Sequence, residues 1–222
     1  MYKDIQELEV ALLSCRQCEL NNEYNLGATS YNGLTTAKLM LVGEGPGQVE
    51  DEYGVPLVGP SGQLLDKALK SVGVTRDCIY TTNVVKCRPR GNRTPTIQEG
   101  TICADLWLTK EIELLKPTAI VALGSVALKY LKDENARITK DRGQWFTTKT
   151  GIPCIATFHP AYLLRLTGKQ LVEAKWQVYY DLKAAVDKVA EAHPDYLFGH
   201  EQITNLLELY TPRKQARAQS KS

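Results

Sequence analysis

The chain has 222 residues, of which 43% are hydrophobic and 23% charged, a composition that suits one globular domain with appendages or at most two small domains. No run approaches the roughly 20 apolar residues of a membrane helix. The first residues, MYKDIQELEV, lack the order of a signal peptide, so we expect a cytoplasmic protein. A net charge of only +2 means that a nucleic-acid partner would need a local basic patch.

Apolar periodicity and turn residues predict alternating helices and strands along most of the chain. In the first half we expect a helix over 4–14, a buried strand over 38–42, a helix over 61–72 capped by Ser61, and a strand over 78–85. In the second half we expect a helix over 95–115 capped by Thr94, a strand over 119–123, a helix over 125–131, a strand over 152–158, and a long helix over 169–190.

This alternation predicts an α/β domain over residues 1–192, with a mostly parallel sheet covered on both faces. Ligands of such sheets bind at the carboxyl ends of the strands. GEGPG (43–47), Asn83 and His159-Pro160 all follow predicted strands, so we expect the site at that edge. Residues 193–222 read as an extension, with a short helix over 203–210 and a disordered basic tail over the last ten residues.

Four of the six cysteines have the spacing of a metal site. Cys15 and Cys18 form a C-x2-C pair, and Cys87 and Cys103 form a looser second pair. Zinc and an iron–sulfur cluster suit this spacing equally well. Cys78 and Cys154 fall in predicted strands and are expected to be packing residues.

The sequence GEGPG lacks the order of a dinucleotide loop and of a P-loop. A simple turn would explain it, but Glu44 stands in a backbone that can approach a ligand closely. Glu50, Asp51 and Glu52 could start a helix or take part in catalysis. His159 is held by Pro160 and followed by Arg165 at a helical offset, which favours a functional histidine over a structural one.

Two basic clusters stand out, and a solvated face or a solubilising tail would explain either of them. The first contains Lys86, Arg88, Arg90 and Arg93 with no acid among them, and the second contains Arg213, Lys214, Arg217 and Lys221.

Together with the four cysteines, the segments GEGPG, VPLVGPSGQLL (55–65), TNVVKCRPRGNRTP (82–95) and HPAYLLR (159–165) resemble family 4 uracil-DNA glycosylases over about residues 5–190. The resemblance implies a three-layer α/β/α fold with a central four-stranded sheet. It also implies a [4Fe-4S] cluster on Cys15, Cys18, Cys87 and Cys103 in place of zinc. The substrate would be DNA containing uracil, and the protein would act as a monomer without a membrane.

The resemblance also gives roles to the residues of the strand ends. His159 would donate to uracil O2, and the amide of Asn83 would read O4 and N3–H. Glu44 would orient the attacking water, while Glu50 would assist or only shape the pocket. Gly43, Gly45, Pro46 and Leu57 would line the base, and Arg88, Arg90, Arg93 and Arg165 would contact phosphates.

One residue departs from the family pattern. Leu57 stands where the family usually has an aromatic residue, so we expect weaker stacking on uracil with the chemistry retained. A related branch that traps DNA covalently is disfavoured, because residues 136–146 contain no histidine.

Three alternatives remain at this stage. They are a relative with a changed base preference, a non-catalytic iron–sulfur protein that binds DNA or transfers electrons, and a nucleotide-binding α/β module. The convergence of Glu44, Asn83 and His159 on one sheet edge speaks against the second, and the lack of a phosphate loop against the third.

Overall fold

The sheet has six strands in the computed structural model, which describes residues 2–199 and 206–215. Four parallel strands form its centre, in the spatial order β3 (Tyr80–Asn83), β2 (Leu39–Gly43), β4 (Ala119–Leu123) and β6 (Pro153–Thr157). The short strands β1 (Asn32–Gly33) and β5 (Trp145–Thr147) add to the two edges in antiparallel orientation. The expected parallel sheet is therefore confirmed, with two edge strands that were not predicted.

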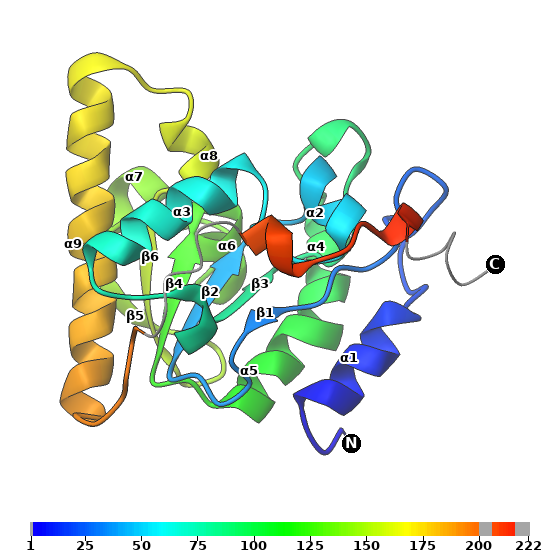
Figure 1. The fold of residues 1–222 in the computed structure, drawn as a ribbon, viewed down its shortest axis with the longest axis horizontal. Coiled ribbons are helices and arrows are strands. Elements are labelled where there is room, and N and C mark those ends of the chain that lie inside the picture. The colour runs from blue at the N-terminus through cyan, green and yellow to red at the C-terminus, as the bar shows by residue number, and fades with distance from the viewer. Residues whose placement is uncertain (1, 200–205, 216–222) are drawn as a thin grey trace.

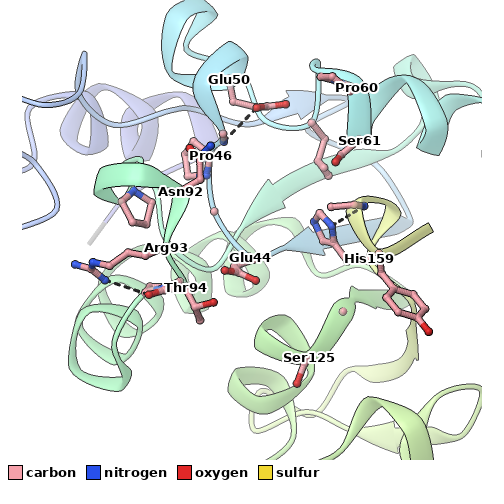
Figure 2. A pocket seen from close by; sticks show the side chains of 18 of the residues that line it. Glu44, Pro46, Glu50, Pro60, Ser61, Asn92, Arg93, Thr94, Ser125 and His159 are labelled. Atoms are coloured by element: carbon pink, nitrogen blue, oxygen red, sulfur yellow. Dashed lines mark hydrogen bonds between the residues drawn. The ribbon is translucent and has the colours of Figure 1, made fainter. Parts of the chain in front are cut away.

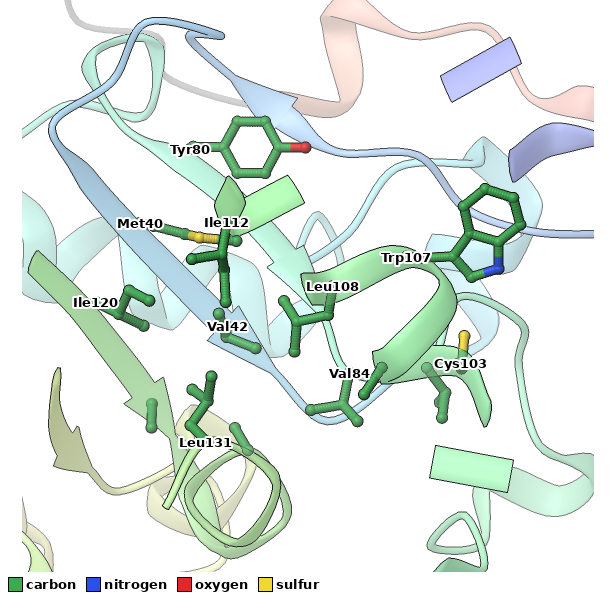
Figure 3. Packing of buried hydrophobic residues seen from close by; sticks show 14 of the residues in the cluster. Met40, Val42, Tyr80, Val84, Cys103, Trp107, Leu108, Ile112, Ile120 and Leu131 are labelled. Atoms are coloured by element: carbon green, nitrogen blue, oxygen red, sulfur yellow. The ribbon is translucent and has the colours of Figure 1, made fainter. Parts of the chain in front are cut away.

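Helices cover both faces of this sheet, so β2 and β4 are buried at every position (Figure 1). One face packs on helices α1 (Ile5–Leu13), α4 (Ile97–Cys103), α5 (Thr109–Leu115) and α6 (Gly124–Leu131). The other packs on α3 (Pro60–Ser71) and α9 (Gly168–Ala192). Alternate residues of β2 belong to the two cores: Met40 and Val42 pack on the first face (Figure 3), and Leu39 and Leu41 on the second.

Two helices begin at residues other than those expected. Thr96, not Thr94, caps α4, because its hydroxyl accepts the N–H of Glu99 while the Glu99 carboxylate accepts the N–H of Thr96. Helix α3 begins at Pro60, not after a Ser61 cap, since proline suits the first turn where no N–H is needed. The expected helix over 95–115 is interrupted by a π-helical turn, η3 (Ala104–Leu108), directly after Cys103.

Short elements surround the carboxyl ends of the strands. They are α2 (Gln48–Tyr53), η2 (Arg90–Asn92), α7 (Ile138–Asp141) and α8 (Pro160–Leu163), whereas the short turn η1 (Arg76–Cys78) precedes β3 at its amino end. The expectation that Cys78 lies in a strand is wrong, because it ends the turn η1 before β3 begins; Cys154 lies in β6 as expected.

Two described parts of the extension after α9, residues 193–199 and 206–215, lie against the domain (Figure 1). Phe198 accepts the N–H of Thr75 at 2.8 Å, and a short turn, η4 (Leu206–Leu209), follows within the expected helix over 203–210. Residues 203–205, and 216–222 of the expected disordered tail, lie outside the described residues. None of the helices in the described part of the chain combines the length and apolar character of a membrane span.

Candidate active site

A cavity of about 780 Å³ opens at the carboxyl ends of the central strands, where the sequence predicts a site. Its size is within the range of small-molecule sites. The loops after β2, β3, β4 and β6 contribute to its walls. The expected site residues that line it are Glu44, Gly45, Pro46, Glu50, Leu57, Arg93, His159 and Arg165. Figure 2 shows Glu44 and His159 turned toward the same space.

Gly43 and Asn83 lie just behind this wall. They are register partners on the adjacent parallel strands β2 and β3. A Cβ on Gly43 would overlap Oδ1 of Asn83 and would come within 3.6 Å of Leu57 Cδ1. Glycine at 43 therefore makes room for the Asn83 amide beside a residue that lines the cavity.

The Asn83 side chain is 1% exposed, and neither its Oδ1 nor its Nδ2 has a hydrogen-bond partner within the described residues. A buried amide without partners costs free energy, so folded proteins rarely keep one without a reason. Its donor and acceptor together match a ligand edge that presents one acceptor and one donor side by side.

Glu44 follows β2 directly and is partly buried in the cavity wall. Its backbone carbonyl accepts the N–H of Val85 at 3.1 Å, which fixes the loop after β2 against the loop after β3. Burial raises the pKa of its carboxyl above the ordinary value, and a hydrogen bond with the Thr94 side chain acts in the opposite direction. Glu44 is thus a carboxylate whose proton affinity depends on a neighbouring hydroxyl.

His159 ends the segment after β6 and caps the short helix α8. Its Nδ1 accepts the backbone N–H of Ala161 at 3.1 Å, so the proton of the neutral ring lies on Nε2. Burial, with a smaller contribution from Arg165, lowers the pKa of His159 to about 4. Gly124 has a φ of +87°, and a Cβ there would be 2.7 Å from that of His159, so this close approach requires glycine.

Glu50 lines the cavity, but its carboxylate accepts hydrogen bonds from backbone N–H groups of the neighbouring loops. Its Oε1 accepts the N–H groups of Val58 and Gly59 at 3.1 and 2.8 Å, and its Oε2 accepts the N–H of Gly47 at 3.1 Å. The carboxylate therefore shapes the two loops that carry Glu44 and Leu57.

The four arginines expected to contact phosphates have different surroundings. Arg93 and Arg165 are exposed and line the cavity. Arg93 also forms a bidentate ion pair with Glu99. Arg88 donates to the Asn92 side chain at 2.7 Å, and Arg90 lies over the ring of Tyr24. These two are on the same loop but do not line the cavity.

Lys86 does not belong to the exposed basic cluster that the sequence suggests. It is 1% exposed, and its ammonium donates to the Glu111 carboxylate at 2.6 Å and also to the Thr82 hydroxyl. A lysine so deep in a core requires such a charged partner. Glu111 is 25 residues away in the chain, so no local pattern reveals the pair.

Thr94 belongs to the candidate site, although the sequence predicts it as a helix cap. It lines the cavity and interacts with Glu44. Gly124, Ser125 and Tyr162 also line the cavity without having been predicted. Thr94 lies inside the segment TNVVKCRPRGNRTP, so that motif was the available signal.

The four cysteines expected to bind metal lie in one region of the fold, where Cys15 and Cys18 pack against the core cluster that contains Cys87 and Cys103. Cys15, Cys18 and Cys103 all act electrostatically on the Cys87 thiol, and burial raises the pKa values of Cys87 and Cys103 to about 12. The backbone N–H of Lys86 donates to Cys103 Sγ at 3.3 Å. In the described part of the chain no three metal-binding side chains are grouped closely enough for a single ion. A four-iron cluster takes one thiolate per iron and so separates its four ligands more widely.

Comparisons with known proteins identify the family of this chain. The profile of the uracil DNA glycosylase superfamily matches residues 30–183. A type-4 uracil-DNA glycosylase of Thermotoga maritima is 42% identical over 71% of this chain and 81% of its own length. One from Pyrobaculum aerophilum is 38% identical over 73% and 85%. A type-5 enzyme of the same organism is 34% identical over 66% and 71%. The chain belongs to the uracil DNA glycosylase superfamily, within its type-4 family.

Proposed function

We propose that this protein removes uracil from DNA by hydrolysing the bond between the base and deoxyribose, leaving an abasic site. The observation that carries the proposal is the Asn83 amide, which has no hydrogen-bond partner among the described residues and is buried behind the cavity wall beside Gly43 and Leu57. In a member of this superfamily, such an amide is suited to reading a base that has been turned out of the helix.

Base discrimination would rest on Asn83. Its Nδ2 donates to uracil O4, and its Oδ1 accepts from N3–H. Cytosine presents an amino group and an unprotonated ring nitrogen at these places, so both contacts would face the wrong partner. In a closed site this leaves polar groups unsatisfied, which disfavours cytosine strongly.

Bond cleavage would rest on His159 and Glu44. The electron pair of the breaking bond moves into the uracil ring, and the Nε2–H of neutral His159 donates to O2 as negative charge develops there. The Glu44 carboxylate holds the water whose oxygen bonds to the sugar carbon, and its charge stabilises the positive sugar. One water proton passes to Glu44 and is then released to solvent, and the uracil anion takes up one proton from solvent.

DNA would be held by phosphate contacts around the cavity. Arg93 and Arg165 line the cavity and are exposed, and Arg88 and Arg90 belong to the same loop after β3 as Arg93. Binding through phosphates is independent of sequence and weakens steeply with salt. We expect single substitutions of these arginines to reduce the salt dependence of binding by about one unit of slope each.

The four cysteines suit a [4Fe-4S] cluster, held by Cys15, Cys18, Cys87 and Cys103. When bound, the cluster would fasten the N-terminal segment to the loop after β3, and hydrolysis needs no electron from it. Iron and visible absorption should be present in the purified protein, absent from Cys87→Ser and retained in Cys154→Ser, which alters a cysteine of β6. Zinc in place of iron would contradict this part of the proposal.

We further infer that the protein acts as a monomer in the cytoplasm. All residues of the proposed chemistry come from a single chain, and a reducing compartment keeps six cysteines available as thiols. Sedimentation at micromolar concentration, with and without DNA, tests the monomer.

A second candidate function follows from Leu57. Leu57 stands where the family usually has an aromatic residue, so the base preference of this site would differ from that of its relatives. A panel of oligonucleotides, each with one deaminated base, separates uracil preference from a broader one.

The decisive experiment measures base release from uracil-containing single- and double-stranded DNA. Wild type should release uracil, and Glu44→Gln and His159→Ala should not do so at a comparable rate. Glu52→Gln is the matched control, because Glu52 is an exposed carboxylate on α2 outside the cavity. Binding of DNA by wild type without any base release would instead favour a non-catalytic DNA-binding protein.

A further inference from the structure

We propose that the segment 206–213, which we call the C-terminal clasp, positions the wall of the base pocket. The inference rests on the proposed function, because it concerns the loop that carries Leu57. The clasp lies beyond residues 30–183, the part of the chain that matches the superfamily profile. It would therefore be a positioning device added to the shared domain.

The first contact is apolar. Leu206 is 6% exposed and packs with Val55 and Val58, the residues that flank Pro56 and Leu57. Leu207 and Tyr210 pack against the same small cluster. This cluster is separate from the two cores of the sheet, so the outer side of the pocket loop has the clasp as its cover.

The second contact is polar. The Arg213 guanidinium donates to the carbonyls of Leu26 and Gly27, each at 3.2 Å, and also to that of Ala28. It lies against Gly54, at the end of α2, where a Cβ would overlap it. Arginine suits this place because its planar fork directs several donors at once.

The inner side of the same loop is held by Glu50, which lines the cavity, and by Arg76, which lies outside it. Glu50 accepts the N–H groups of Val58 and Gly59, and the buried Arg76 donates to the carbonyl of Leu57 at 2.7 Å. Loop 54–59 thus lies between the pocket residues on one side and the clasp on the other.

Leu57 explains why a second support matters. Its φ is +53°, in the left-handed region that a leucine rarely adopts. Such a conformation persists only where the surroundings fix it. Removing the outer support would let the loop relax, and the Leu57 side chain would leave its place beside Gly43 and the pocket.

The principal variant is Arg213→Ala, with Arg213→Lys as the conservative change and Lys214→Ala as the charge-matched control, since Lys214 is exposed on the same segment. Single-turnover release of uracil should fall at least fivefold in Arg213→Ala and less in Arg213→Lys. It should stay at the wild-type rate in Lys214→Ala. Affinity for uracil-free DNA should remain within twofold in all three, because the proposed phosphate contacts lie elsewhere.

A double-variant cycle separates positioning from general weakening. Leu57→Ala removes the side chain that the clasp would position, so Arg213→Ala should cost little more in that background. If the two losses in rate simply multiply, the clasp does not act through Leu57 and the inference is overturned. A wild-type rate in Arg213→Ala would overturn it as well.

Hydrogen exchange gives a readout that needs no activity. The amides of Val58 and Gly59, which donate to Glu50, should exchange faster in Arg213→Ala than in wild type, while those of β4 stay unchanged. Absence of uracil release by wild type would contradict the proposed function. Unchanged exchange at Val58 and Gly59 would contradict the clasp, so the two failures are distinguishable.

Discussion

The backbone N–H of Ala161 donates to Nδ1 of His159, a residue that lines the cavity, and this bond leaves the ring proton on Nε2. With a pKa of about 4, the ring stays neutral at physiological pH, so in the proposed reaction it would donate a hydrogen bond without carrying a charge. The burial of the ring and its tautomer act together to keep it neutral, because protonation of Nδ1 would also break the hydrogen bond from Ala161.

The first prediction concerns this histidine. His159→Ala should lower the single-turnover rate about 100- to 1000-fold, the usual cost of losing a donor to a developing anion. Because the ring gains its proton only near pH 4, the rate of wild type should show no histidine step between pH 5 and 8. A pH–rate profile tests this. An acid limb that disappears from the residual activity of His159→Ala would contradict the assignment.

The second prediction concerns Glu44 and Thr94. Burial raises the Glu44 pKa, and the carboxyl acts in its ionised form, so activity should be present above that pKa and be lost as the pH falls through it. Thr94→Val removes the hydrogen bond that lowers this pKa, so the acid limb should move to higher pH. Thr94→Ser keeps the hydroxyl and should leave the limb in place. A shift in the serine variant as well would mean that the methyl group, not the hydroxyl, matters.

The third prediction concerns Glu50. A glutamine offers one acceptor oxygen where three backbone N–H groups now find two. Glu50→Gln should reduce the free energy of unfolding by about 1–3 kcal/mol, the cost of a buried group left unpaired. Glu52→Gln, on the exposed side of the same helix, should change it by less than about 0.5 kcal/mol. Urea denaturation measures both, and equal values would contradict a structural role for Glu50.

The fourth prediction concerns Leu57. Leu57→Phe supplies an aromatic face worth about 1–3 kcal/mol for each stacked base, so KM for uracil-containing DNA should fall with little change in kcat. Leu57→Met stays apolar without a π-face and should resemble wild type. Steady-state kinetics on one substrate distinguish the three proteins. An unchanged KM in the phenylalanine variant would show that residue 57 does not contact the base.

The fifth prediction concerns the buried pair of Lys86 and Glu111. Glu111→Gln leaves the Lys86 ammonium without its counter-charge and should destabilise the fold by about 3–5 kcal/mol. Glu113→Gln breaks the neighbouring surface pair with Lys110, both partners of which are about half exposed, and should cost about 0–1 kcal/mol. Thermal or urea unfolding gives both values. Comparable losses would mean that burial of Lys86 is compensated in another way.

The sequence was most informative where local chemistry decides the structure. Buried strands, the glycine-rich turn around Glu44 and the His159-Pro160 pair could be located because each depends on a few consecutive residues. The burial of Lys86 could not be predicted, since it depends on an ion pair with Glu111, which is distant in the sequence and comes close only in the folded chain. Thr94 was assigned to a helix end because Thr94 and Thr96 both precede the helix, and only the Thr96–Glu99 exchange identifies the cap.

Long-range contacts also explain why the role of the C-terminal extension could not be predicted from the sequence. Nothing near Arg213 in the chain indicates three carbonyls as its partners, because those lie about 185 residues away. The strands β1 and β5 were missed for a related reason. They are two and three residues long and owe their extended form to their neighbours in the sheet.

The register that pairs Gly43 with Asn83 makes the Asn83 amide, which we propose reads the base, part of the sheet, whereas Leu57 belongs to a loop. Sheet hydrogen bonds open only with the whole domain, while loops open locally and at lower cost. On warming, the enzyme should therefore lose affinity for uracil-containing DNA well before it loses discrimination against cytosine. Discrimination against cytosine and affinity for uracil would therefore be lost at different temperatures, although both depend on the same pocket.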